Sequence, residues 1–457
     1  MRSNDDDALR EALRAEALLL APEWTMRRDA PARGLGVVVE GGRFADVGPL
    51  AEVAARHSHL RALPLPRTLL APGFVDTHHH LTQSFGKALA FGEPSEIFRR
   101  IWVPLESRLD ARGLYLSAKL AALEALRGGF TTVCDAGTRA EAGLEAIAVA
   151  TREAGLRCVL ALTCNDDGSR HAQVLRAAEQ HLAHGAPLLH PSLAVSIPEA
   201  ATDAMMRAVS ALCAEAGAVF QVHVNEHLAS VERSLVARAL RPLQHLHAAG
   251  ALGAQALLAH CTMLTPDEIV LLRDSGAAVA INPVASQWKG NAVAPSALLA
   301  ALGVRLGLGT DGTRSDAFRL MDAAEANQRI AFGLAGGDSS CGAGALWLEM
   351  ATHRGADAAG LGAVTGEVAA GKAADFLLID LDTPELTPSW DLRWELVRLA
   401  SRDQIRSVHV GGRLRLWQGW PIDWDAHALL DEVRRTAGDA VARAGIHKVH
   451  PRGVGAD

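Results

Sequence analysis

The sequence predicts an α/β fold: a (β/α)8 TIM barrel with a small β-sandwich domain formed by both termini. Two observations predict the barrel. Short apolar segments alternate with alanine-rich segments through the middle of the chain, and polar residues directly follow several of the apolar segments. A third observation predicts the sandwich, because hairpin patterns occur near both ends of the 457 residues.

Residues 1–72 are expected to form the N-terminal part of the β-sandwich. The segment Gly34–Arg43 has the pattern of a strand that enters a hairpin. Gly41 and Gly42 can adopt the positive φ angles that a tight turn requires, so the sequence places the turn there.

Residues 73–365 are expected to form the barrel. The eight candidate strands are Thr68–Val75, Thr131–Asp135, Arg157–Leu162, Leu193–Ser196, Val219–Val224, Ala256–His260, Ala278–Asn282 and Arg305–Thr310. The segments between them, such as Leu114–Leu126 and Ala201–Ala216, have the composition and length of helices. Eight β-α units over about 250 residues fit a closed barrel. A doubly wound open sheet is the structural alternative.

Residues 366–457 are expected to complete the β-sandwich and to add a C-terminal helix. Ala374–Asp380 has the pattern of one strand, and Arg406–Leu416 has the pattern of a second hairpin. The last long segment, Trp424–Ile446, is predicted to be an amphipathic helix on the surface.

The composition is typical of a globular protein. The chain is 49% hydrophobic and 21% charged, and its net charge is -7, so we expect no nucleic-acid partner, which would need a basic face. No apolar run reaches the ~18 residues that a membrane span requires, and the polar N-terminus does not look like a secretory signal. The six scattered cysteines form no C-x-x-C pair and indicate a reducing compartment. We therefore expect a cytoplasmic protein without membrane contact.

Several strand ends carry residues that suit a metal ion. His78 and His80 point the same way on an extended chain, whereas His79 points away. His223 lies at the carboxyl end of the fifth candidate strand, and Asp311 follows the eighth. Because the carboxyl ends of barrel strands meet at one rim, we expect His78, His80, His223 and Asp311 to bind one divalent ion. An open position would remain for water.

Three further roles follow from such a metal site. A divalent ion lowers the pKa of bound water to about 7, which makes hydroxide available at neutral pH. Glu226 is placed to carry a proton between the water and the leaving group. His260 ends the sixth candidate strand and is expected to hydrogen-bond the hydroxide and the charge that develops on the substrate.

These motifs together resemble the amidohydrolase superfamily. The resemblance rests on Pro-Gly-Phe-Val-Asp-Thr-His-His-His-Leu at residues 72–81, on His-x-x-Glu at His223, on Ala-His-Cys around His260, and on Gly-Thr-Asp-Gly around Asp311. It covers nearly the whole chain and is closest to the mononuclear deaminase and chlorohydrolase branch, whose members act on purines, pterins, cytosine and triazines. This implies one Zn²⁺, or alternatively Fe²⁺, in a barrel flanked by a β-sandwich.

Two absences support the mononuclear branch. Binuclear members use a carboxylated lysine from the fourth strand, and this chain has no lysine between Lys119 and Lys289. The His-x-Glu and Pro-Cys-x-x-Cys signature of the small zinc deaminases is also missing.

The residues expected around the substrate depart from the family pattern. Ser196 stands where relatives often have a histidine, and Gln287 stands where they often have an asparagine. We expect Gln83 to hydrogen-bond a ring amide, Trp102 to line the pocket and Arg314 to meet an anionic group. The structural alternatives are a solvated loop position for Gln83 and a helix-packing role for Trp102. The departures leave the identity of the heterocycle open.

We therefore expect a metal-dependent deaminase that acts on a planar, aminated nitrogen heterocycle and releases ammonia. Hydroxide would attack the carbon that carries the amino group, and Glu226 would protonate the ring nitrogen and then assist ammonia departure. Asp311 would take the proton from the water, and His260 would stabilise the tetrahedral intermediate. The alternatives are a cyclic-amide or C–Cl hydrolase that uses the same water, or a non-catalytic binding barrel. We expect a small-molecule substrate as the partner, and a homodimer or higher homo-oligomer.

Overall fold

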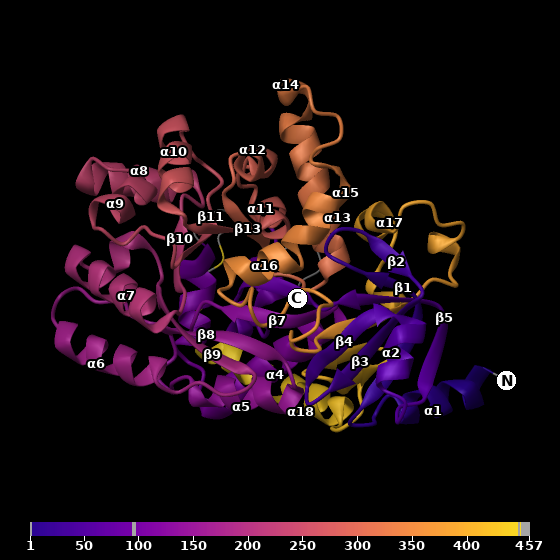
Figure 1. Cartoon of the computed structure of the whole chain (residues 1–457). Coiled ribbons are helices and arrows are strands. Elements are labelled where there is room, and N and C mark those ends of the chain that lie inside the picture. The colour runs from indigo at the N-terminus through magenta and orange to yellow at the C-terminus, as the bar shows by residue number, and fades with distance from the viewer. Residues whose placement is uncertain (1, 94–96, 447, 449–457) are drawn as a thin grey trace, which may run out of the picture.

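The computed structural model describes residues 2–93, 97–446 and 448, and this part of the chain contains two β-sheets (Figure 1). One sheet has eight parallel strands whose spatial order follows the chain from β6 to β13. Their bounds are β6 (Phe74–His79), β7 (Phe130–Asp135), β8 (Arg157–Thr163), β9 (Leu189–Val195), β10 (Phe220–Val224), β11 (Ala256–His260), β12 (Ala278–Ile281) and β13 (Arg305–Leu308).

The first and last of these strands meet and close the barrel. His79, at the end of β6, forms a parallel bridge with Asp311, just beyond β13. The Asp311 amide also donates a hydrogen bond to the His78 carbonyl at 2.8 Å. The predicted (β/α)8 barrel is therefore confirmed, and the open doubly wound sheet is excluded.

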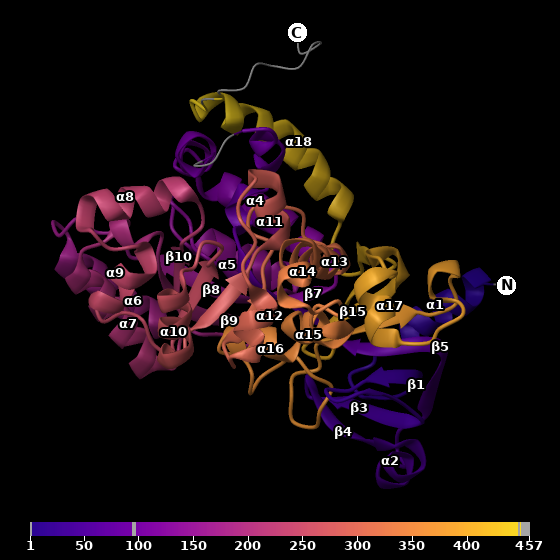
Figure 2. The same ribbon diagram turned by 90° about the horizontal axis from the view of Figure 1, so that it is seen from above.

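Helices join successive strands and cover the outside of the barrel (Figure 2). They are α4 (Ala111–Arg127), α5 (Glu145–Ala154), α6 (His171–Leu182), α7 (Asp203–Ala216), α8 (Leu228–Arg238), α9 (Pro242–Ala248), α10 (Pro266–Ser275), α11 (Pro283–Lys289), α12 (Ser296–Ala301) and α13 (Ala317–Gln328). The bounds of α7 follow from local chemistry. The Thr202 side chain caps the helix by accepting from the Met205 amide, and Gly217 ends it at a φ of 66°.

Two longer insertions depart from the simple β-α repeat. The connection from β6 to β7 contains η1 (Leu81–Gln83), η2 (Lys87–Ala90), a π-helical turn η3 (Phe98–Trp102) and α3 (Val103–Glu106) before α4. After α13 come the π-helical turn η5 (Arg329–Gly333), α14 (Leu334–Gly336), α15 (Ala343–Met350) and α16 (His353–Ala358). Residues of the first insertion line a cavity at the carboxyl ends of the barrel strands.

The second sheet combines strands from both ends of the chain. The N-terminal strands are β1 (Leu18–Met26), β2 (Pro31–Arg33), β3 (Leu35–Glu40), β4 (Arg43–Pro49) and β5 (Ala62–Pro72), and the C-terminal strands are β14 (Phe376–Asp380), β15 (Ile405–Val410), β16 (Arg413–Trp417) and β17 (Trp420–Pro421). The two groups join where β14 pairs with β5 in antiparallel fashion. Helices α1 (Arg2–Ala12) and α2 (Leu50–Arg56) flank this terminal sheet, which lies to one side of the barrel (Figure 2).

The terminal sheet curls until its two predicted hairpin turns meet. Gly41 and Gly42 connect β3 to β4 with φ angles of 57° and 77°, and Gly411 and Gly412 connect β15 to β16 with φ angles of 58° and 72°. A Cβ atom on Gly42 would lie 3.1 Å from the Gly411 carbonyl oxygen. One hydrogen-bonded sheet therefore provides both layers of the small β-domain. The division into residues 1–72, 73–365 and 366–457 stays a prediction.

The first barrel strand differs from the prediction. The expected strand Thr68–Val75 is wrong, because residues up to Pro72 belong to β5 in the terminal sheet and β6 begins only at Phe74. Gly73 separates the two strands. Its amide donates to the Asp375 carbonyl at 2.9 Å, and a Cβ atom there would lie 2.1 Å from Thr131 Oγ1. The chain passes from one sheet to the other where no side chain fits.

The C-terminal part contains η6 (Pro384–Leu386), α17 (Leu392–Arg398) and η7 (Arg402–Gln404), and it ends in α18 (Ala426–Arg443). One further short turn, η4 (Pro198–Ala200), lies in the barrel between β9 and α7. Helix α18 corresponds to the predicted Trp424–Ile446 helix and packs against α4, where Arg112 donates to the Glu432 carboxylate at 2.8 Å. All six cysteines are buried and unpaired. Among the described helices, none is both long and apolar enough to cross a membrane.

Candidate active site

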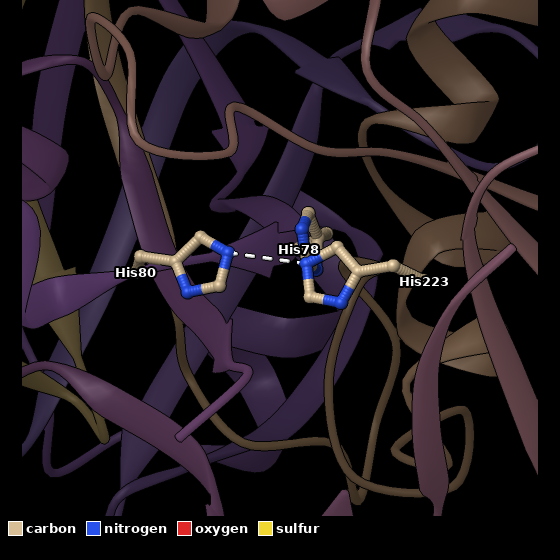
Figure 3. A group of neighbouring side chains, drawn as sticks. All are labelled: His78, His80 and His223. Carbon is tan, nitrogen blue, oxygen red and sulfur yellow. Dashed lines mark hydrogen bonds between the residues drawn. The ribbon is translucent and has the colours of Figure 1, made fainter. Parts of the chain in front are cut away.

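Three histidines converge at the carboxyl ends of β6 and β10 (Figure 3). The ring centroids of His78 and His80 are 5.0 Å apart, those of His78 and His223 are 4.7 Å apart, and those of His80 and His223 are 5.3 Å apart. The Nε2 atoms of His80 and His223 approach to 3.3 Å. The structure thus brings together the three histidines that the sequence selected from two distant segments.

Asp311 and His260 complete this cluster. Asp311 Oδ1 lies 3.4 Å from His80 Nε2 and 3.8 Å from His78 Nε2. Asp311 Oδ2 lies 4.0 Å from His260 Nε2. Two sets of three potential ligand atoms lie within 4.8 Å of one another: His78, His80 and His223 form one set, and His78, His260 and Asp311 form the other. All of these groups belong to one potential metal site.

The chemistry of the cluster fits a divalent metal ion. Burial lowers the pKa of His78 and of His80 well below the usual range and lowers the pKa of His223 to about 4, so the imidazoles are neutral and can act as ligands. Burial opposes ionisation of Asp311, but Lys289 and His260 hold its pKa well below the usual range. The Nε2 atom of His78 is buried and has no hydrogen-bond partner among the described residues. Three nitrogen donors and one carboxylate suit zinc.

Residues behind the ligand cluster fix its orientation. His223 Nδ1 donates to the Ser196 carbonyl at 2.6 Å, which leaves Nε2 for the site. His79 points away from the cluster, as expected, and its Nδ1 lies 2.8 Å from Thr310 Oγ1. The buried carboxylate of Asp76 accepts from the amides of Thr310 and His78 at 3.0 and 3.2 Å. These bonds hold the end of β6 against the segment that follows β13.

Strand ends near the site have unusual backbone geometry. His260 and Asp311 adopt φ angles of 79° and 58°, and Asn225, just beyond β10, adopts 51°. Positive φ costs energy for a residue with a side chain and concentrates at functional positions. Asn225 is held by its side-chain bond to Glu268 Oε1 at 2.9 Å. The surrounding structure therefore supports a strained rim at the strand ends that carry the candidate ligands.

Glu226 lies beside the ligand cluster. Its Oε2 atom is 3.8 Å from His260 Nε2, and its Oε1 atom accepts a hydrogen bond from Lys289 Nζ at 2.7 Å. Burial opposes ionisation, but the neighbouring His260 and Lys289 outweigh it and lower the pKa of Glu226. The carboxylate is ionised and belongs to neither of the two potential ligand sets.

Lys289 is a site residue that sequence reasoning missed. Its Nζ atom donates to Glu226 Oε1 and to Asp311 Oδ2, at 2.7 Å in each case. The side chain is 13% exposed, and the two carboxylates raise the pKa of its ammonium group against the opposing effect of burial. The sequence contains one signal that could have identified Lys289. Lysine is rare in this chain, with only 5 in the sequence, and Lys289 closely follows the end of the seventh barrel strand.

A cavity opens next to the cluster and takes in three of the five residues expected to bind substrate. Gln83, Trp102 and Ser196 all contribute to its wall. Gln83 is buried, and its Oε1 atom has no hydrogen-bond partner among the described residues. Arg139 also lines the cavity and was not predicted; the buried carboxylate of Glu106 accepts its hydrogen bond at 3.0 Å.

The other two expected substrate residues lie outside the cavity wall. Gln287 is exposed and donates to Asn327 at 2.9 Å. Arg314 pairs with Asp316 at 2.7 Å. Helix geometry explains the first difference, since two residues along a helix correspond to a rotation of about 200°. Gln287 and Lys289 therefore leave α11 in opposite directions, and the lysine faces the site.

A closed β/α barrel with a histidine-rich cluster at the carboxyl ends of its strands defines a metal-dependent hydrolase of the TIM-barrel class. The chain belongs to the amidohydrolase family, whose pattern it matches over residues 69–415. A short stretch, residues 36–57, also matches an imidazolonepropionase-like composite domain of bacteria. The resemblance stated from the motifs is thereby confirmed.

Proteins similar to this chain include several deaminases. It is 28% identical over 412 residues to the 5-methylthioadenosine/S-adenosylhomocysteine deaminase of Syntrophobacter fumaroxidans, which covers 88% of this chain and 92% of the relative. It is 28% identical over 427 residues to the 5'-deoxyadenosine deaminase of Methanosarcina mazei, with 89% and 94% covered. A zinc-bound adenosine deaminase from Xanthomonas campestris has the same fold, with a TM-score of 0.84, 24% identity, and 93% and 98% of the two chains covered.

Proposed function

We propose that this chain removes the exocyclic amino group of an adenosine-like nucleoside by hydrolysis. Membership of the amidohydrolase family, together with deaminase relatives that align over nearly the whole chain, makes it a hydrolytic deaminase of an aminated heterocycle, as the sequence predicted. The observation that carries the proposal is the arrangement of Glu226 and His260. The Glu226 carboxylate lies 3.8 Å from His260 of the histidine–aspartate cluster, and Glu226 also lines the cavity that opens there.

The metal in this proposal is one zinc ion held by His78, His80, His223 and Asp311. When bound, the ion would supply hydroxide near neutral pH by lowering the pKa of water. The neutral state of the buried imidazoles and the ionised state of Asp311 support this ligand set. Fe²⁺ is the alternative ion for the same donors.

The protein's own residues would manage the protons. Both protons would come from the attacking water. Glu226, which is ionised before the reaction, is placed to take the first proton from that water and to deliver it to the ring nitrogen next to the amino-bearing carbon. Asp311 Oδ2 is placed to accept the second proton, which would leave with the amine, so that one water adds and one ammonia departs. His260 Nε2, which lies 3.8 Å from Glu226 Oε2, would donate to the oxygen that develops negative charge.

The cavity wall suits a planar ring with polar edges. Ile97, Phe98 and Trp102 give one side of the cavity an apolar surface, on which a purine can pack. Gln83 Oε1 has no partner among the described residues and is available to accept a hydrogen bond from the substrate. Such an acceptor favours a substrate with an N–H or O–H group, because otherwise the buried oxygen would stay unsatisfied.

A substrate screen by ammonia release tests the proposal. Purified, zinc-loaded protein is given adenosine, 5'-deoxyadenosine, 5-methylthioadenosine and S-adenosylhomocysteine, with guanine, cytosine and an aminotriazine as comparisons. We expect kcat/KM for at least one adenosine-like nucleoside to exceed that for every comparison compound. A pyrimidine or triazine preference would contradict the adenosine-like assignment, and no ammonia from any compound would contradict the deaminase assignment.

Elemental analysis tests the metal assignment separately. We expect about one zinc per chain in the wild type and loss of that zinc in His78→Ala and His223→Ala. Two tightly bound ions per barrel would contradict the mononuclear site. Homo-oligomeric assembly and a cytoplasmic location stay predictions, and light scattering of the purified protein tests the former.

A further inference from the structure

A second hollow, at the opposite end of the barrel strands from the candidate catalytic groups, is lined by basic side chains. It lies between the amino-terminal ends of β8 and β9 and the two hairpin turns of the terminal sheet. Its charged lining consists of five arginines with one histidine: Arg43, Arg152, Arg157, Arg413, Arg415 and His190. No carboxylate is among the described residues of its wall. We call this cavity the arginine hollow.

Two of the five guanidinium groups are already engaged by the protein. Arg157 makes a buried, two-pronged ion pair with Asp375 at 2.9 and 3.2 Å. Arg43 donates to the Gly371 carbonyl at 2.7 Å. The side chains of the remaining three, Arg152, Arg413 and Arg415, make no hydrogen bond or ion pair with any described residue.

Arg415 is the most buried of the three unpaired arginines. Arg413 and Arg415 are two residues apart on β16, so their side chains leave the strand on the same face. Burial, and then the neighbouring Arg413, lower the pKa of Arg415. Arg415 Nε is buried without an acceptor, against Gly155, where a Cβ atom would lie 2.5 Å from that nitrogen. Asp423 and Asp375 act in the opposite direction on the pKa of Arg415, but neither makes an ion pair with it, so this group of arginines has positive charge available for an anion.

We propose that the arginine hollow binds a small phosphate-bearing anion through Arg152, Arg413 and Arg415. Guanidinium groups match phosphate oxygens in a bidentate fashion, and several of them suit a multiply charged phosphate better than a single carboxylate. The rest of the wall includes Leu188 and Leu189. This apolar part would accommodate a ring attached to the phosphates, so a nucleotide and inorganic pyrophosphate are the two sources to compare.

This hollow is separate from the catalytic cluster. It lies at the amino-terminal ends of β8 and β9, whereas the ligand cluster lies at the carboxyl ends of the barrel strands. Strand β9 runs from Leu189, in the wall of the hollow, to the residue before Ser196, whose carbonyl accepts a hydrogen bond from His223. An anion bound there would contact none of the groups assigned to deamination.

Calorimetric titration of the full-length, zinc-loaded protein tests the proposal. The probes are ATP, pyrophosphate and adenosine, each at low and at raised salt. We expect ATP and pyrophosphate to bind with an affinity that falls as salt rises. Equal affinity for the two would assign the site to the phosphates alone, whereas tighter binding of ATP would add a contact to the base. Adenosine, which has no phosphate, should show none of this salt-dependent binding.

Paired substitutions locate the binding. Arg152→Gln with Arg413→Gln removes two exposed arginines of the hollow and should weaken pyrophosphate binding at least tenfold. Arg238→Gln with Arg434→Gln removes the same charge from exposed helical positions and should leave binding within twofold of the wild type. Arg413→Lys keeps the charge but removes the guanidinium group that can bind phosphate through two hydrogen bonds. Its affinity for pyrophosphate should lie between those of the wild type and the Arg152→Gln, Arg413→Gln variant. No pyrophosphate binding by the wild type at millimolar concentration, or equal binding by both paired variants, would overturn the proposal.

Discussion

The substitution Glu226→Gln separates proton transfer from metal and substrate binding. It keeps the size and hydrogen-bonding reach of the side chain but removes the group that can carry a proton. Glu226 belongs to neither potential ligand set, so the metal content should not change. Lys289 loses one of its two charged partners but keeps Asp311 at 2.7 Å, so no buried charge is left alone.

The expected size of the effect follows from these contacts. A positioned general acid–base group contributes ~10² to 10⁴ in rate, which corresponds to about 3 to 5 kcal/mol of activation free energy. Breaking a buried pair by removing one partner costs about 3–5 kcal/mol of folding stability. Because Lys289 stays paired, the loss of stability in Glu226→Gln should fall below that range. A large loss of kcat with a small loss of stability is therefore expected.

The assay combines steady-state ammonia release, zinc analysis and urea denaturation of the same preparations. Glu199→Gln is the matched control, because Glu199 lines the same cavity but pairs with Arg233 at 3.9 Å. We expect Glu226→Gln to lose at least a hundredfold in kcat, and Glu199→Gln to stay close to the wild type in kcat. Near-normal turnover in Glu226→Gln with full zinc content would refute the assigned role, and the proton carrier would then be sought at Asp311 or His260.

Three further predictions concern other parts of the structure. Lys289→Met should lower kcat about tenfold or more with zinc content retained, because it removes the two charge-assisted hydrogen bonds that position the site carboxylates. Each such hydrogen bond contributes about 1.5–3 kcal/mol. Unchanged kcat at saturating substrate would contradict this prediction. Asp375→Ala should lower the free energy of unfolding in urea by about 3–5 kcal/mol, since it leaves the buried Arg157 guanidinium without its partner. The control Asp274→Ala breaks an exposed pair and should cost less than about 1 kcal/mol; equal losses would argue against a structural role for the buried pair. Burial is the main reason that the pKa of His409 falls from 6.5 to about 3. The unfolded state therefore takes up the proton first, and the free energy of unfolding should decline as pH falls from about 6.5 to 3. His409→Gln should flatten that decline by up to about 1.4 kcal/mol per pH unit in urea titrations at pH 6 and pH 4.5, and an unchanged slope would show that other groups control it.

Much of the fold could be predicted because its signals are local. A strand of five or six residues is visible in the sequence as an apolar run, and each of the two hairpin turns is visible as a pair of adjacent glycines. Short stretches of sequence were therefore enough to predict both hairpin turns and the alternation of strands and helices in the barrel. The error at Thr68–Val75 has a non-local cause. The apolar run is continuous, and only the approach of Thr131 to Gly73 in the folded chain shows why one sheet ends and the other begins there.

The sequence alone determined which side chains end the barrel strands. His78, His80, His223, His260 and Asp311 each sit at or just beyond an apolar run, and the parallel arrangement of a barrel brings all such ends to one rim. Their convergence could be predicted without knowledge of the distances between the side chains, because it depends on strand direction and not on the details of packing.

Only the tertiary structure decided which side chains from helices and loops reach that rim. Lys289 faces the two site carboxylates while Gln287 faces solvent, and this difference depends on the rotation of α11 about its axis. The arginine hollow likewise gathers residues from α5, β8, β9 and both hairpin turns. Such encounters depend on how elements distant in the sequence pack together. Because packing is set by the shape of the whole core, no short stretch of sequence contains that information.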